Sequence, residues 1–187
     1  MYIDHKNNNT YWTESIKLEM YNVGVSFEVL VAWVRAPPGW RKVSGNIIFD
    51  VKMDFTRKAR WVKGGHWTPD PVIPSYYGVL SREYVCISLT HSTLLGIETM
   101  AADIWNAYLQ ALSSLKYYIT CGPEFGIDNF GRVALIQRAL YGRKMTGGEF
   151  WMHLQKCMAE LGFEFSKAYP AFWFRASKRN NLDDYYE

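Results

Sequence analysis

The chain has 187 residues and a mass of 21.8 kDa, enough for a domain that buries a core without disulfide bonds. Hydrophobic residues make up 49% of it, which excludes a chain that is disordered throughout. No apolar run is long enough to cross a membrane, and the polar stretch Met1–Asn9 lacks the features of a signal peptide. Three widely spaced cysteines exclude a disulfide framework and a four-thiolate zinc site.

The net charge of +3 is unevenly distributed along the chain. Residues 35–65 hold eight basic residues against two acidic ones, and Trp40, Phe55 and Trp61 lie among them. The basic residues are Arg35, Arg41, Lys42, Lys52, Arg57, Lys58, Arg60 and Lys63. Cations interleaved with aromatic side chains are typical of surfaces that contact phosphates. The alternative interpretation is an ordinary solvated basic hairpin.

The first half of the chain is rich in predicted strands. A short helix is expected over residues 11–20, and a strand over 27–35 that Pro37-Pro38-Gly39 would end. Two strands, 47–53 and 59–63, flank a polar turn, and three prolines make 68–74 a loop. A helix over 81–96 would have Ser81 as its N-cap and Gly96 at its C-terminal end.

In the second half, an apolar run predicts a buried strand over residues 97–103 that leads into a helix. Short strands are expected at 116–120, 133–136 and 171–175. The clearest helix runs from Gly148 to Leu161, because apolar residues repeat along one face and Gly162 follows as a natural C′ residue. Alternating strands and helices after a hairpin-rich first third predict a mixed α/β or α+β domain.

Several catalytic signatures are absent from the sequence. The four histidines form no HExxH arrangement, and none lies near two cysteines at the spacing of metal ligands. The sequence also contains no GxSxG, GxxxxGK[ST] or GxGxxG motif. Hydrolase, P-loop and dinucleotide-binding functions therefore have no support.

One carboxylate has a setting that suggests chemistry. Asp103 lies at the end of the apolar run 97–103, and Tyr108 follows five residues later on a predicted helical turn. A single aspartate at the end of a strand is most often a helix N-cap, and spacing alone does not establish a metal ligand.

The sequence around Asp103 resembles a known motif. Residues 102–109, Ala-Asp-Ile-Trp-Asn-Ala-Tyr-Leu, resemble motif A of reverse transcriptases of the Ty1/copia retrotransposon class, usually Asp-Val-x-x-Ala-Phe/Tyr-Leu. Residues 57–65 are similar to the fingers signature Lys-Ala-Arg-Leu-Val-Ala-Lys-Gly, and 122–126 to Gln-Pro-Glu-Gly-Phe. Residues 139–144, 150–151 and 161–163 match Ser-Leu-Tyr-Gly-Leu-Lys, Trp and Leu-Gly-Phe in that order. The resemblance extends over residues 10–187.

The resemblance implies an RNA-directed DNA polymerase within a Pol polyprotein, with the α+β fold of the fingers and palm of a right-hand polymerase. Residues 1–35 would be an N-terminal segment, 36–96 a fingers-like basic hairpin and helix, and 97–187 a partial palm with motifs A and B. The partners would be an RNA or DNA template with a DNA primer, deoxynucleoside triphosphates and the rest of the polyprotein, with no membrane. The chain would be cytoplasmic, in a virus-like particle, or nuclear, and not secreted.

The resemblance also implies a metal site. Asp103 and the backbone carbonyl of Ile104 would coordinate two Mg²⁺ ions. Such ions stabilise the negative charge that develops on the attacking 3′-oxygen and on the leaving pyrophosphate. Magnesium prefers hard oxygen ligands of this kind and retains substrate phosphates in its coordination shell.

Nucleotide-binding roles follow from the other motifs. Arg60, with Lys58 as a weaker candidate, would hold the incoming triphosphate, because a guanidinium binds phosphate bidentately. Tyr108 would be the steric gate that occupies the space of a ribose 2′-hydroxyl, and Gly142 and Lys144 would lie in the motif B loop. The alternatives are surface charges for the two cations, a core aromatic for Tyr108 and a plain turn for Gly142.

Departures from the family pattern set the remaining expectations. Met145 replaces the glutamine of motif B, Tyr169 replaces the aspartate of Ala-Asp-Pro, and bulky Trp105 stands in motif A. The sequence stops before the Tyr-Val-Asp-Asp hairpin of motif C, and Asp183 and Asp184 are expected in a solvated loop instead. The isolated chain is therefore expected to be inactive. The alternatives to a polymerase are a non-catalytic nucleic-acid-binding remnant and a decayed transposon reading frame.

Overall fold

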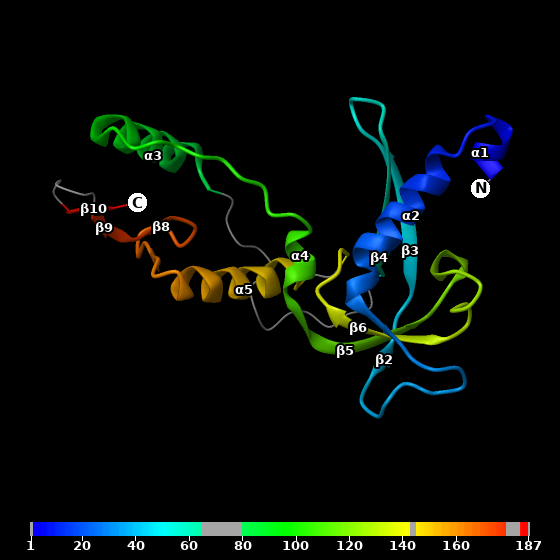
Figure 1. Ribbon diagram of the computed structural model, residues 1–187. Helices are drawn as coiled ribbons and strands as arrows, with labels where there is room; N and C mark the ends of the chain where they lie inside the picture. Colours follow the sequence, from blue (N-terminus) through cyan, green and yellow to red (C-terminus); the bar gives the residue numbers. More distant parts are fainter. Residues whose placement is uncertain (1, 65–79, 143–144, 179–183, 187) are drawn as a thin grey trace. The chain divides into compact units, whose positions relative to one another are not determined.

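The computed structural model describes residues 2–64, 80–142, 145–178 and 184–186 (Figure 1). They divide into two compact units. Unit 1 comprises Met1–Ser75 with Asn106–Phe150, and unit 2 comprises Tyr76–Trp105 with Trp151–Glu187. The described residues form short helices and small, mostly antiparallel sheets, so the α+β class is confirmed. The three-part division at residues 35/36 and 96/97 rests on motifs and stays a prediction.

A four-stranded sheet forms the base of unit 1, in the order β1-β6-β5-β2. The strands are β1 (Phe27–Val29), β2 (Arg41–Lys42), β5 (Leu112–Thr120) and β6 (Val133–Arg138). Strands β1 and β5 are antiparallel to β6, and β2 is parallel to β5. Three short helices flank the strands: η1 (Gly24–Ser26), α4 (Ala107–Gln110) and η2 (Pro123–Phe125).

A helix and a hairpin complete unit 1. Helix α1 (Tyr2–Lys6) precedes α2 (Tyr11–Val23), and strands β3 (Gly45–Val51) and β4 (Arg57–Lys63) form an antiparallel hairpin. Figure 1 shows α2 running beside this hairpin. The Ser15 hydroxyl and the Glu19 carboxylate on α2 accept hydrogen bonds from the backbone N–H groups of Ala59 and Trp61, at 2.7 and 2.8 Å. The helix therefore satisfies backbone donors along the free edge of β4.

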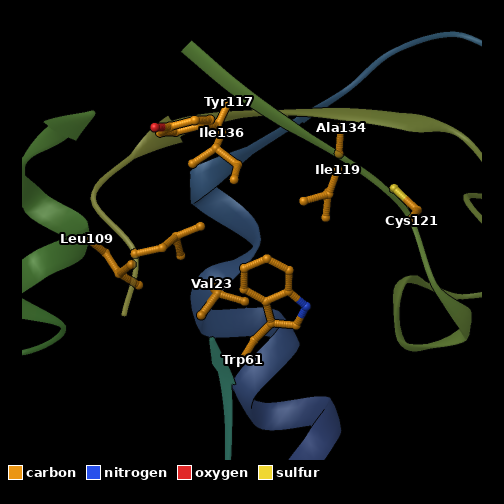
Figure 2. Packing of buried hydrophobic residues seen from close by; sticks show 9 residues of the cluster. Val23, Trp61, Leu109, Tyr117, Ile119, Cys121, Ala134 and Ile136 are labelled. Carbon is orange, nitrogen blue, oxygen red and sulfur yellow. The ribbon is translucent and has the colours of Figure 1, made fainter. Parts of the chain in front are cut away.

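The hydrophobic core of unit 1 joins the hairpin to the sheet (Figure 2). Trp61 of β4 is fully buried, and the ring of Phe27 packs edge-on against it at 5.0 Å between centroids. The other buried members come from α2, α4, β5, β6 and the segments after the strands: Val23, Leu109, Tyr117, Ile119, Cys121, Ala134, Ile136 and Leu140. Burial raises the pKa of the Cys121 thiol, so this cysteine is a core residue rather than a reactive one.

Unit 2 contains helix α3 (Arg82–Leu95) and most of helix α5 (Thr146–Glu160), whose first turns belong to unit 1. Two small hairpins follow: β7 (Glu164–Phe165) with β8 (Trp173–Phe174), and β9 (Ala176–Lys178) with β10 (Asp184–Tyr186). Among the described residues, no helix is long and apolar enough to cross a membrane.

Both long predicted helices are confirmed, although α5 begins at Thr146, two residues before the predicted start at Gly148. Ser81 lies at the N-cap of α3, and Gly96 ends this helix in the left-handed conformation, with its N–H directed to the Ser92 and Thr93 carbonyls. Gly162 likewise has a positive φ after α5. These ends are encoded locally, because glycine adopts the left-handed conformation without steric cost.

The buried strand predicted over residues 97–103 is wrong. This segment is irregular and mostly exposed, and the side chain of Met100 is 89% exposed. A strand needs a hydrogen-bonded neighbour, and no described strand pairs with this segment. The strand expected over 27–35 also ends early, at Val29, because its partner strand β6 begins at Val133. The Leu30 N–H still donates a hydrogen bond to the Val133 carbonyl, and beyond Leu30 no described strand pairs with the segment.

The two loops predicted from polar or proline-rich sequence have different outcomes. Asp184 was expected in a solvated loop, but its backbone lies in strand β10, paired with Lys178 of β9. Asp183 and the loop predicted at 68–74 lie outside the described residues.

Candidate nucleotide and nucleic-acid site

Strand β4 presents basic side chains on one face and core residues on the other. Lys58 and Arg60 alternate with the buried residues Ala59, Trp61 and Lys63. Arg60 is exposed and Lys58 is half-buried, on the face that the two-residue period of a strand predicts. The two cations predicted to bind phosphate are therefore neighbours on one side of the hairpin.

The carboxylate of Glu19 lies close to these two cations. Burial raises its pKa above the ordinary value of 4.5, and the hydrogen bond from Trp61 together with the charges of Lys58 and Arg60 oppose that rise. Because burial dominates, Glu19 carries a charge that is poorly solvated in the folded state. Its proximity also offsets part of the positive field of the two cations.

The turn at Tyr141-Gly142 contacts the end of β4. The Lys63 N–H donates a hydrogen bond of 3.0 Å to the Tyr141 carbonyl. Gly142 has a φ of +87°, and a Cβ added there would overlap the Lys63 carbonyl oxygen. Glycine is thus required at this position for two separate reasons, conformation and space. The turn is fixed against the hairpin, and the role of Gly142 in a motif B loop stays a prediction, because these contacts also suit a structural turn.

Tyr108 lies on the single-turn helix α4 and is half-buried. Its ring packs edge-on against Tyr141 and Phe150, with centroids 5.2 and 5.9 Å apart. The structure thus brings Tyr108 to the turn that holds Gly142. Its role as a steric gate stays a prediction, since a half-buried ring in an aromatic cluster also satisfies the packing alternative.

Asp103 and Ile104 lie in unit 2, in an irregular segment, and both are exposed. The expectation that Asp103 is a helix N-cap is wrong, because Asn106 occupies that position of α4. A carboxylate and a carbonyl suit Mg²⁺ by chemistry, but in the part of the chain that the structure describes no group of three or more His, Cys, Asp or Glu residues could hold a metal ion.

One basic residue has a position that its charge does not predict. Lys63 is 1% exposed, and its ammonium nitrogen lies 3.4 Å from the centroid of the Tyr117 ring. The signal for its burial is the strand period, which places residue 63 on the same face as Ala59 and Trp61. Lys144 lies outside the described residues.

Comparisons with protein families, curated proteins and solved structures find no match for this chain. The assignment of a function therefore depends on the motifs of the sequence and on the geometry of unit 1.

Proposed function

We propose that this chain is part of a Ty1/copia-type reverse transcriptase and that unit 1 binds the primer–template and the incoming nucleotide. The observation that carries the proposal is the placement of Lys58 and Arg60 together on the outer face of the β3–β4 hairpin. Phosphates are bound by clustered cations, and Arg60 offers the bidentate geometry that a triphosphate accepts.

The contacts around the hairpin support the same proposal. The Tyr141-Gly142 turn is hydrogen-bonded to the end of β4, and Tyr108 packs on that turn. Tyr108, Gly142 and strand β4, to which the resemblance gives roles in nucleotide binding, all belong to unit 1, and this supports the proposal. By the same resemblance, Asp103 and the Ile104 carbonyl would hold Mg²⁺, which would stabilise the negative charge of the reacting phosphates.

The proposal is tested by measuring the affinity of the chain for a fluorescent primer–template by anisotropy. The double variant Lys58→Ala/Arg60→Ala should weaken binding, because two phosphate contacts are lost. A charge-matched control, Lys156→Ala/Lys167→Ala, removes two exposed lysines of unit 2 and should leave the affinity nearly unchanged. Equal losses in the two double variants would show that only net charge matters and would contradict the proposed site.

A non-catalytic remnant would also bind nucleic acid, so primer–template binding does not distinguish it from a reverse transcriptase. A different measurement separates these two functions. Transcript sequencing downstream of Glu187 supports the polymerase if it finds an in-frame Tyr-x-Asp-Asp within a few dozen codons. A stop codon before any such motif favours the remnant. A chain that binds no primer–template even at low salt contradicts both and favours the decayed reading frame.

A further inference from the structure

Helix α5 carries a cysteine and a histidine in direct contact. The sulfur of Cys157 lies 3.7 Å from Nε2 of His153, within hydrogen-bond range for sulfur. The two residues are four positions apart, so they lie one turn apart on the same face of the helix. Both belong to unit 2, and neither has a role in the nucleotide site proposed above.

The Cys157–His153 pair is accessible to solvent, because both side chains are partly exposed. The other two cysteines have different surroundings. Cys86 on α3 is exposed and makes no hydrogen bond with a histidine in the part of the chain that the structure describes. Cys121 is buried in the core of unit 1. The chain therefore contains one thiol beside a base, one exposed thiol without a base and one buried thiol.

A thiol next to an imidazole is typical of reactive cysteines. The imidazole can accept the thiol proton, and the thiolate that results is the nucleophile. Cys157 lies in the last turn of α5, where the partial negative charge of the helix end disfavours a thiolate. The imidazolium of His153 carries a full positive charge in contact with the sulfur, so its attraction outweighs that partial charge.

We propose that Cys157 is a site of thiol–disulfide exchange with small disulfides and that His153 is its general base. His153 Nε2 takes the proton of the Cys157 thiol, and the thiolate attacks one sulfur of the disulfide. The S–S bond of the small disulfide breaks as the new S–S bond to Cys157 forms, and the leaving thiolate takes the proton from the imidazolium. The products are a mixed disulfide on Cys157 and one small thiol. This proposal does not depend on the function proposed above.

The test is a time course of the native chain with glutathione disulfide at neutral pH, in which mass spectrometry quantifies each cysteine-containing peptide. Exposure alone gives the order Cys86, Cys157, Cys121, whereas the proposal places Cys157 first. A free thiol is only a few per cent thiolate near neutral pH, so complete proton transfer would raise the rate by roughly thirtyfold. A stabilised thiolate is a weaker nucleophile, so we expect Cys157 to react about tenfold faster than Cys86.

Two variants assign this advantage to the imidazole. His153→Gln keeps a polar side chain that favours a helix but removes the base. It should slow Cys157 to the rate of Cys86 or below, while Cys86 itself is unchanged. The matched control Lys156→Gln removes a neighbouring ammonium whose side chain is 77% exposed, and it should leave the rate at Cys157 nearly unchanged.

The native chain tests the proposal even without a variant, because a faster reaction at Cys86 than at Cys157 would overturn it. Equal rates at Cys157 in the native chain and in folded His153→Gln would also overturn it, since the imidazole would then contribute nothing. So would a loss of the advantage in Lys156→Gln, which would assign the effect to the ammonium. Circular dichroism checks the folding of both variants.

Discussion

Replacement of Gly142 by alanine tests the contact between the Tyr141-Gly142 turn and the end of β4. At this position the backbone has a φ of +87°, and the new methyl group would overlap the carbonyl oxygen of Lys63. The turn must therefore move away from β4, and the hydrogen bond from the Lys63 N–H to the Tyr141 carbonyl should lengthen or break. A matched control is Gly131→Ala, since Gly131 also has a positive φ, +78°, but open space around the position of a Cβ.

The expected losses of stability follow from what the two variants share, a positive φ, and from what only Gly142→Ala adds, the overlap with Lys63. The left-handed conformation costs a non-glycine residue about 1–2 kcal/mol, and this cost applies to both variants. Only Gly142→Ala adds the lost hydrogen bond, about 0.5–1.5 kcal/mol, and the displacement of neighbouring backbone. We therefore expect a loss of about 2–4 kcal/mol in the free energy of unfolding for Gly142→Ala against about 1–2 kcal/mol for Gly131→Ala.

The assay is urea unfolding of the native chain and of both variants, followed by near-ultraviolet circular dichroism. The effect of alanine on the entropy of the unfolded chain is common to the two variants and cancels in their difference. Hydrogen exchange of the Lys63 amide provides a local measurement and should be faster only in Gly142→Ala. Equal stability of the two variants, with an unchanged Lys63 amide, would refute the reasoning that the turn is fixed against β4.

Three further predictions concern stability. Trp61→Ala should lower the free energy of unfolding by about 3–5 kcal/mol, because the ring is fully buried in the core; urea unfolding checks this, and a loss below about 1 kcal/mol would contradict it. Burial raises the pKa of Glu19, so the stability of the native chain should fall as the pH rises from 4.5 through that raised value. Glu19→Gln keeps an acceptor for the Trp61 N–H and should remove this pH dependence. If the free energies of unfolding of the native chain and of Glu19→Gln differ by the same amount at every pH, Glu19 is not a buried charge. Desolvation raises the pKa of Asp4, but hydrogen bonds from Thr13 and Trp12 outweigh it and hold the pKa below 3.8. The stability that Asp4 contributes should therefore be present above pH 3.8 and be lost as the pH falls through its lowered pKa, and melting of Asp4→Asn across this range should show no such loss.

The elements predicted correctly are those that local sequence specifies. Helix α3 has a serine N-cap and a glycine at its C-terminal end, and α5 has one apolar stripe followed by Gly162. The hairpin β3–β4 follows from two runs of strand-forming residues around a polar turn. The segment 97–103 has the composition of a strand but no pairing partner among the described strands, and sequence composition does not report pairing.

Some features of the candidate site also follow from local sequence, and others depend on long-range packing. The side of the hairpin on which Lys58 and Arg60 lie follows from the period of a strand, and the same period accounts for the burial of Lys63. The close approach of Gly142 to the Lys63 carbonyl joins residues 79 positions apart. Long-range contacts of this kind come from tertiary packing, which motif spacing does not specify.

The most direct test of the proposed function is the salt dependence of primer–template binding. Each phosphate contact contributes about 0.9 to the slope of log K against log salt concentration on a duplex. The native chain should bind at low salt with a steep slope, and Lys58→Ala/Arg60→Ala should reduce that slope by about 1–2, while Lys156→Ala/Lys167→Ala should not change it. No binding at low salt, or the same slope in the native chain and in Lys58→Ala/Arg60→Ala, would contradict a nucleic-acid site on the β3–β4 hairpin.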